Sequence, residues 1–279
     1  MLVEIRRLWP AGLVDACTCE GCQLGFARPM VEGDAAFYEL LHERAGYPRE
    51  RWEFRRAREN FVGSGGRVLD VGGGRGDFLA SLPDAIEKHA VEASPTLRSE
   101  LARRGIVAHA DLGAAAAAGP YHVVTMFHVL QYFADPVAAL ASCRAMLLPN
   151  DEDGGGRLLI SLPNALAGGA IDVLPSPPHP LTRWTRTAIE RAIAAAGMHV
   201  DGFAWIPQRT SSLLWAANAR TRERAVAEPR SIAGRIDAMR RGRLRTALLL
   251  ACASVSLPGI LRTASSRLRH SQLFIVARP

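Results

Sequence analysis

The sequence has few cysteines and almost no lysine. Five cysteines in 279 residues are too few for a disulfide scaffold. The first ten residues contain Glu4, Arg6 and Arg7 and no apolar core, so they lack the pattern of a secretory signal. We therefore expect a cytoplasmic protein. Lys88 is the only lysine, and the composition rich in arginine and alanine is typical of a GC-rich bacterial genome.

The positive charge is concentrated in one region. Residues 209–270 contain thirteen arginines and three acidic residues, a net charge of +10, whereas the whole chain has +7. Within this region an uncharged run of sixteen residues, Thr246–Leu261, is shorter than the ~20 residues that span a bilayer, and Pro258 interrupts it. An apolar segment between arginines, 240–262, fits peripheral contact with anionic lipid at the inner face of the membrane. It fits equally a helix buried on a sheet or in a dimer.

Aromatic residues are not interleaved with these arginines, and no nucleic-acid-binding motif occurs in the sequence. Base stacking on aromatic side chains beside a basic surface is typical of proteins that bind single strands. We therefore expect no nucleic-acid partner.

Apolar runs typical of strands alternate with runs typical of helices, which predicts an α/β fold. Strands are predicted at 67–71, 87–92, 106–110, 121–126, 157–162, 199–206 and 271–277, and helices at 77–82, 95–104, 136–147 and 185–196. This alternation favours a Rossmann-like, seven-stranded, mostly parallel sheet with helices on both faces. We divide the chain into a preface (1–60), a core (61–208), a basic helical insert (209–270) and the last strand of the core (271–279).

The most informative segment is Arg67–Leu79, where an apolar run leads into a glycine turn and then a helix start. Its spaced glycines are Gly72, Gly74 and Gly76, and a dinucleotide fingerprint would have glycine or alanine at position 77. Asp77 stands there instead, and its carboxylate repels a pyrophosphate. The turn therefore fits a nucleoside ligand without phosphates, for which S-adenosylmethionine is the obvious candidate, and disfavours an NAD-dependent oxidoreductase.

A carboxylate follows the second predicted strand. Glu92 ends the run His89–Glu92, sixteen residues after Gly76. At the tip of the second strand a carboxylate can accept two hydrogen bonds from a ribose diol. The glycine turn and Glu92, in this order and at this spacing, together predict an S-adenosylmethionine site.

These motifs resemble those of the class I S-adenosylmethionine-dependent methyltransferases, and most closely a broad bacterial group acting on small molecules and envelope metabolites. Motifs that read LDVGCGxG, a strand-end Glu and FHVLEH in that group appear here as LDVGGGRG (69–76), VEASP (91–95) and FHVLQY (127–132). The resemblance implies the fold predicted above, a methyl-transfer activity and S-adenosylmethionine as the cofactor.

The resemblance covers residues 61–206 and recurs at 271–277. Residues 158–164 match the family's fifth strand, and 178–185 match its substrate-side loop. The sequence departs from the family pattern at three positions: His122 replaces an Asp common in the fourth strand, and Gln131 and Tyr132 replace Glu and His.

The resemblance implies a role for each matching residue. Asp70 would orient the turn and the amino group of the cofactor, the glycines would line its methionine part, and Glu92 would hold its ribose. Asp111 would lie by the adenine amine, with Leu112 packed on the ring. The full set of cofactor-binding residues implied is Asp70, Gly72, Gly74, Gly76, Glu92, Ala93, Asp111, Leu112 and Phe127.

Asp111 and His128 each allow two interpretations. Asp111 can equally cap the helix indicated by the alanine run 114–118. Phe127 and His128 would border the methyl sulfonium, and His128 is a candidate for catalysis, although a pocket-wall role suits it better than that of a base.

The loop Pro175–Trp184 supplies the candidate acceptor-side residues. Its prolines would hold it stiffly at the open end of the sheet, where ligands bind in such folds. His179 is our preferred base for methylating a hydroxyl, and it could equally only shape the loop. Trp184 could stack on a substrate.

Three cysteines, Cys17, Cys19 and Cys22, lie in the preface. Some relatives have two cysteine pairs here that form a zinc knuckle, and this chain keeps only the second pair plus Cys17. A structural zinc needs four ligands, so the fourth would have to come from His42 or from another chain. Free thiols fit the sequence better than a metal site. Residues 34–60 are expected to be helical. In the family such a segment commonly packs as a lid over the cofactor, and a packing helix without ligand contact is the alternative.

We expect methyl transfer from S-adenosylmethionine to a small-molecule or lipid- or sugar-linked acceptor, with oxygen as the favoured atom. No Asn-Pro-Pro-Tyr or Asp-Pro-Pro-Tyr sequence follows the fourth strand, which argues against methylation of nucleobase amines. The alternative is a methyltransferase-like binding or scaffold protein that has lost catalysis.

Overall fold

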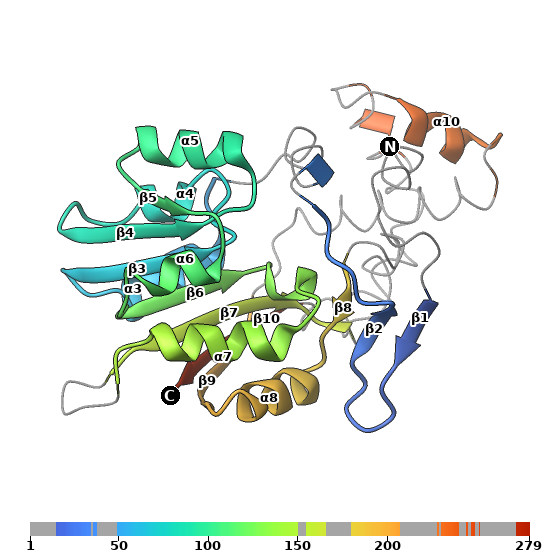
Figure 1. Ribbon diagram of the computed structural model, residues 1–279. Coiled ribbons are helices and arrows are strands. Elements are labelled where there is room, and N and C mark those ends of the chain that lie inside the picture. The colour runs from blue at the N-terminus through green and yellow to red at the C-terminus, as the bar shows by residue number, and fades with distance from the viewer. Residues whose placement is uncertain are drawn as a thin grey trace.

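The computed structural model describes residues 15–34, 36–37, 49–149, 155–165, 180–206, 228, 230–239, 244, 247–248, 251 and 272–279. Its centre is a seven-stranded sheet with the strand order β5-β4-β3-β6-β7-β10-β9 (Figure 1). The strands are β3 (Gly66–Val71), β4 (Ile86–Val91), β5 (Val107–His109), β6 (Val123–Phe127), β7 (Arg157–Pro163), β9 (His199–Trp205) and β10 (Gln272–Arg278). The α/β fold and the seven strands predicted from the sequence are confirmed.

Strand direction changes only at β10. Strands β3 to β7 pair in parallel, whereas β10 is antiparallel to both β7 and β9. The register pairs Val71 with Val91 and Phe127 with Ser161, so the carboxyl ends of β3, β4, β6 and β7 lie at one edge of the sheet. In open parallel sheets this is the edge where ligands bind.

Helices cover both faces of the sheet, as predicted. The helices α6 (Leu112–Ala116), α7 (Pro136–Met146) and α8 (Arg186–Ala195) contribute buried residues to one apolar cluster, with alternate residues of β6 and β7. The helices α3 (Trp52–Asn60), α4 (Asp77–Ala80) and α5 (Pro95–Arg103) contribute to a second cluster on the opposite face. Alternation along the strands therefore fixes which side chains lie under α3.

Local sequence signals set the ends of several helices. Asp135 caps α7 through a hydrogen bond from the backbone N–H of Ala138, and Pro136 takes the first helical position. Gly197 follows α8 with a φ of +76°, a left-handed conformation that ends helices.

A second sheet lies beyond the carboxyl end of β7 (Figure 1). It has three antiparallel strands in the order β1 (Asp15–Thr18), β2 (Gly25–Arg28) and β8 (Thr182–Arg183). A parallel bridge between Asn164, directly after β7, and Trp184, directly after β8, links this second sheet to the end of β7. The sequence analysis did not predict this sheet.

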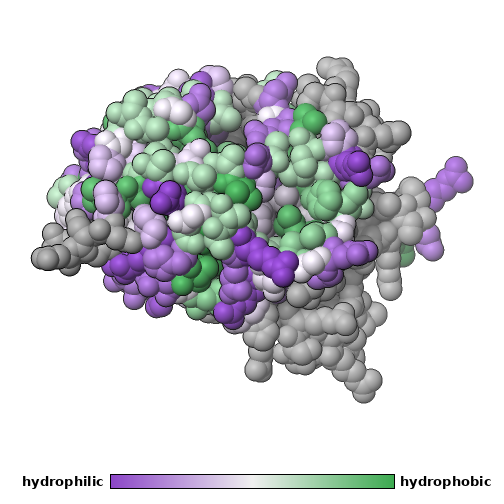
Figure 2. Space-filling model, turned by 60° about the horizontal axis from the view of Figure 1, so that its bottom comes forward, coloured by the Kyte–Doolittle hydropathy of each residue, from purple (hydrophilic) through white to green (hydrophobic). Residues whose placement is uncertain are grey.

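The basic insert is described only in part, at α10 (Ile232–Ala238) and a few residues around it. The large hydrophobic side chains exposed in the described residues are Val107, Ile232 and Leu244, and the last two belong to this insert. On the face turned forward in Figure 2, hydrophilic and hydrophobic residues are interspersed in small groups. Among the described helices, none has the length and apolar character needed to cross a bilayer.

Candidate functional site

The glycine turn after β3 lies at the carboxyl edge of the sheet. Gly74 has a φ of +55°, and a Cβ atom built on it would meet no atom within 4 Å among the described residues. At Gly72, in contrast, a Cβ atom would lie 2.6 Å from Cγ2 of Val129, the second residue after β6. Gly72 therefore lets the turn pack against the end of β6, while Gly74 borders open space in which a ligand can approach the backbone.

Glu92 joins β4 to this turn. Its carboxylate is buried and accepts one hydrogen bond from the backbone N–H of Gly74 and one from that of Ser94, both at 2.9 Å. A carboxylate has about four acceptor positions, more than these two hydrogen bonds occupy. A carboxylate in this position is of the kind that accepts hydrogen bonds from the two hydroxyls of a ribose, the role predicted for Glu92.

Asp70 is buried under the turn, at the end of β3. It accepts a hydrogen bond of 2.6 Å from the hydroxyl of Thr125 on β6. Burial raises the pKa of Asp70 to about 7; the Thr125 hydrogen bond and the charge of Arg51 act in the opposite direction, and the charge of Glu92 adds to the rise. Asp70 is thus a buried carboxyl that changes charge near neutral pH.

Asp111 caps α6. Its carboxylate accepts a hydrogen bond of 2.8 Å from the backbone N–H of Ala114, as the capping interpretation predicts. The residue is exposed and follows β5, so its second carboxylate oxygen is not committed to the cap, and an adenine contact stays a prediction. Leu112 is half-buried and Ala93 is exposed at the end of β4.

The two residues at the end of β6 lie in different surroundings. Phe127 is buried and packs with Phe54 of α3 and Phe78 of α4, at ring-centroid distances of 5.5 and 5.2 Å. His128 has a φ of +56°, rare for a residue with a side chain, and its side chain is 19% exposed. Phe127 therefore packs against α3 and α4, and its contact with the cofactor stays a prediction, whereas the side chain of His128 is partly exposed.

Glu53, in the first turn of α3, is the functional candidate that the sequence analysis missed. Its Oε1 atom lies 3.2 Å from Nε2 of His128 and 3.8 Å from the guanidinium of Arg51, and its side chain is 4% exposed. Burial raises the pKa of Glu53, but the hydrogen bond and charge of His128 outweigh burial, so the net pKa is below its usual value. The signal available in the sequence was a carboxylate between two aromatic residues, Trp52 and Phe54.

The acceptor-side predictions are described only in part. His179 lies outside the described residues. Trp184 is 1% exposed and packs in the apolar cluster under α7 and α8, so stacking on a substrate would require its ring to be uncovered. Its indole Nε1, the hydroxyls of Ser161 and Thr182, and Oε1 of Gln131 are buried without a hydrogen-bond partner among the described residues.

The cysteines of the preface lie on and after β1. Cys17, Cys19 and Cys22 are half-buried free thiols, and hydrogen bonds from Cys22 lower the pKa of Cys19. In the described part of the chain, no three His, Cys, Asp or Glu side chains are grouped to hold a metal ion. The suggested fourth ligand, His42, lies outside that part.

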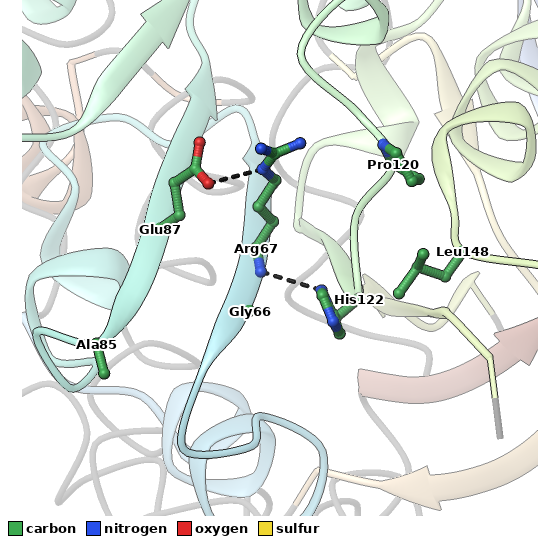
Figure 3. A pocket seen from close by; sticks show the side chains of 7 residues that line it. All are labelled: Gly66, Arg67, Ala85, Glu87, Pro120, His122 and Leu148. Carbon is green, nitrogen blue, oxygen red and sulfur yellow. Dashed lines mark hydrogen bonds and ion pairs between the residues drawn. The ribbon is translucent and has the colours of Figure 1, made fainter. Parts of the chain in front are cut away.

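A pocket of about 410 Å³ lies at the opposite, amino edge of the sheet (Figure 3). Within it, Glu87 accepts a hydrogen bond from the guanidinium of Arg67, and Nδ1 of His122 accepts one from the backbone N–H of Arg67. Its lining residues are Gly66, Arg67, Ala85, Glu87, Pro120, His122 and Leu148. The position of His122 here separates it from the predicted cofactor residues, all of which are at or near the carboxyl edge.

Comparisons with known proteins agree with this geometry. A family model described as a methyltransferase domain matches residues 41–202. No curated protein matches the sequence. A methyltransferase from Archaeoglobus fulgidus described as SAM-dependent is 16% identical, with a TM-score of 0.55, and the match covers 87% of this chain and all of that one.

Two further solved structures have the same fold. Coclaurine N-methyltransferase, bound to N-methylheliamine and SAH, is 11% identical with a TM-score of 0.51, over 81% of this chain and 71% of that one. A complex of the Haloferax volcanii Trm112 methyltransferase activator with a protein named as a methyltransferase gives 17% identity and a TM-score of 0.51, over 82% and 89%.

The family match spans more than half of the chain, and the seven-stranded, mostly parallel sheet is the fold that the resemblance implied. The protein belongs to the methyltransferase-domain family and is a class I S-adenosylmethionine-dependent methyltransferase.

Proposed function

We propose that the protein transfers the methyl group of S-adenosylmethionine to an oxygen atom of a small-molecule or lipid- or sugar-linked acceptor. The observation that carries the proposal is the position of His128. The residue after it, Val129, packs on Gly72, so the backbone of His128 lies next to the glycine turn, and its side chain is 19% exposed.

The residues at the carboxyl edge fit the cofactor. Glu92 would hold the ribose, the turn at Gly74 would approach the methionine part, and Asp70 beneath the turn would orient the amino group. Asp111 and Leu112 would border the adenine. The bound cofactor supplies a methyl group on a sulfonium, and the protein has to align an acceptor with it, which is mainly a matter of proximity.

Oxygen is favoured by the presence of a group that can take a proton. A neutral hydroxyl is a poor nucleophile and its attack benefits from a base with a pKa near neutrality. Histidine has such a pKa. His128 lies at the site, and His179 remains a second candidate in the loop that follows β7.

The test is a transfer assay with radiolabelled S-adenosylmethionine and a panel of phenols, hydroxy acids, and primary and secondary amines. The amines belong in the panel because coclaurine N-methyltransferase shares the fold and is named for transfer to nitrogen. Labelling of hydroxylated acceptors supports the proposal. Labelling of amines alone contradicts oxygen transfer, and cofactor binding without any labelling favours the alternative of an inactive binding or scaffold protein.

We also propose that the four-part division made from the sequence holds, and that segment 240–262 of the insert contacts anionic lipid. The exposed Ile232 and Leu244, which are 74% and 65% accessible, support an apolar contact surface next to the arginines. The intact protein should sediment with vesicles containing phosphatidylglycerol and a variant lacking 240–262 should not. Failure of the intact protein to sediment contradicts the proposal.

A further inference from the structure

We propose that Glu53 is a positioning residue for catalysis: its carboxylate holds the imidazole of His128 with the proton on Nε2, so that Nδ1 takes the proton of the acceptor hydroxyl. This inference rests on the proposed function, because it assigns the base for oxygen methylation. It also gives α3 a role beyond covering the sheet.

The proton position follows from the contact between the two side chains. An ionised carboxylate can only accept hydrogen bonds, so Nε2 of His128, 3.2 Å from Oε1 of Glu53, must carry the hydrogen. In a neutral imidazole the other nitrogen, Nδ1, is then an acceptor. No described residue forms a hydrogen bond with Nδ1. The pair therefore presents a basic nitrogen away from Glu53.

The backbone of His128 is held in place by hydrogen bonds on both sides. Its N–H donates to the carbonyl of Ser161 on β7 at 2.9 Å, and its carbonyl accepts from the side-chain amide of Gln131 at 2.9 Å. These bonds maintain the left-handed φ of +56°. A left-handed conformation is uncommon for a residue with a side chain, and such conformations recur at functional sites, where they aim a side chain.

Packing of the neighbouring aromatic side chain fixes the position of Glu53. The next residue, Phe54, lies between Phe78 and Phe127, at ring-centroid distances of 5.4 and 5.5 Å. These aromatic contacts attach the first turn of α3 to the end of β6. The carboxylate on α3 and the imidazole after β6 therefore belong to two elements that pack against each other. A carboxylate held beside a histidine in this way orients a catalytic imidazole.

Arg51 links the pair electrostatically to two further charged groups. It precedes α3 and lies 3.8 Å from Glu53, and its charge also acts on Asp70 of β3. Glu92, at the end of β4, acts on Asp70 as well. Since the pKa of Asp70 is raised to about 7, its change of charge falls in the pH range of the test, and the test has to separate it from an effect of Glu53.

In the step we infer, the acceptor oxygen forms a bond to the methyl carbon as the bond between that carbon and the sulfonium sulfur breaks. The bonding electrons go to sulfur, which becomes the neutral thioether of S-adenosylhomocysteine. The hydroxyl proton passes to Nδ1 of His128, and the imidazolium formed is stabilised by the charge of Glu53. The proton then leaves to solvent.

The first readout is the titration of His128 itself, measured by NMR on protein with isotope-labelled histidine. His128→Asn identifies the signal by its loss, and asparagine tolerates a left-handed φ. In Glu53→Gln the titration curve of this imidazole should move to lower pH, because an adjacent negative charge is removed. The matched control, Glu59→Gln, removes an exposed carboxylate from the same helix and should leave this curve unchanged.

The interference from Asp70 is removed by repeating the titration in Asp70→Asn. The effect of Glu53→Gln on His128 should persist in that background. An identical titration curve of His128 with and without Glu53→Gln, in protein whose spectrum shows that it is folded, overturns the proposal. The titration needs no acceptor and no cofactor, so its outcome does not depend on the proposed function.

The second readout is the pH profile of kcat/KM on the best hydroxylated acceptor of the panel. Because the neutral imidazole is the base, activity is lost as the pH falls and the imidazole gains a proton. Glu53→Gln removes the adjacent negative charge and should move this acidic limb to lower pH. It should also reduce the maximum about 10-fold or more, while the affinity for S-adenosylmethionine stays within twofold. If activity falls but the acidic limb of the pH profile keeps its position, Glu53 has only a structural role, and the proposal is overturned. Absence of turnover on every acceptor contradicts the proposed function instead.

Discussion

The carboxylate of Glu92 accepts the backbone N–H of Gly74 at 2.9 Å and so joins the end of β4 to the glycine turn after β3. The same carboxylate accepts the N–H of Ser94, which begins α5. One buried side chain thus sets the relative positions of the turn, the strand end and the next helix. The cofactor site depends on this carboxylate for its shape as well as for its contact with ribose.

Replacement of Glu92 by alanine should therefore weaken S-adenosylmethionine binding strongly. Loss of hydrogen bonds to a charged group costs about 1.5–3 kcal/mol each, which corresponds to at least a 10-fold rise in Kd. Calorimetric titration measures the change, with Asp84→Ala as the control, since Asp84 is an exposed carboxylate shortly before β4. A Kd within twofold of the wild-type value would exclude the ribose role.

Alanine at Gly74 and alanine at Gly76 should have different effects. Gly76 also has a positive φ, +76°, and a Cβ atom there would lie 2.6 Å from Leu101 and 2.8 Å from Ile106, both buried. Gly76→Ala should therefore reduce the free energy of unfolding by the ~1–2 kcal/mol of a left-handed alanine and by a further ~1–3 kcal/mol of overpacking. At Gly74 the Cβ would enter open space, so Gly74→Ala should cost only the ~1–2 kcal/mol of a left-handed alanine but weaken cofactor binding. Thermal unfolding and calorimetry on both variants check this. Equal losses of cofactor affinity in folded protein would contradict it.

The raised pKa of Asp70 predicts a pH dependence of stability. The unfolded protein releases this proton near the ordinary value of 3.8, and the folded protein releases it near 7, so the folded state holds more protons between these values. The free energy of unfolding should fall as pH rises across this window, by at most ~1.4 kcal/mol per pH unit, and then level off. Asp70→Asn should lack this component in denaturant titrations at pH 4 to 8. The same pH dependence in wild type and Asp70→Asn would show that Asp70 is not its source.

The cysteines should differ in reactivity with iodoacetamide. The pKa of Cys19 is lowered by hydrogen bonds from Cys22, whereas burial raises the pKa of Cys143 to about 12. Because the thiolate is the reacting species, Cys19 should be alkylated well before Cys143 in folded protein at pH 8. Mass spectrometry of peptides at successive times gives the order. Modification of Cys143 at the same rate would indicate that its helix, α7, opens readily.

The strands of the central sheet could be predicted from the sequence because buried parallel strands are continuous apolar runs. Residues 157–162, for example, were predicted as a strand, and β7 extends over Arg157–Pro163. The glycine turn and Glu92 could be placed because each directly follows such a run. In these cases the local pattern contains the information that fixes the structure.

The second sheet and Glu53 could not be predicted because both depend on contacts between distant parts of the chain. Strand β8 has two residues and pairs with β2, more than 150 positions earlier. Glu53 contacts His128 because α3 packs across the end of β6. The segment that contains Glu53 has the amphipathic pattern of an ordinary helix, so this pattern does not mark the carboxylate as functional. The burial of Trp184 with residues of α7 and α8 leaves no trace in its own short segment, so the sequence could not predict it, and a substrate contact of Trp184 stays a prediction.

The central claim is tested most directly by calorimetric titration of the purified protein with S-adenosylmethionine, S-adenosylhomocysteine and NAD in parallel. We predict micromolar binding of the two adenosyl compounds and no binding of NAD, because the turn at Gly74 and the carboxylate of Glu92 fit a nucleoside without phosphates. Folded protein that binds neither adenosyl compound, or that binds NAD as well as either, would contradict the account.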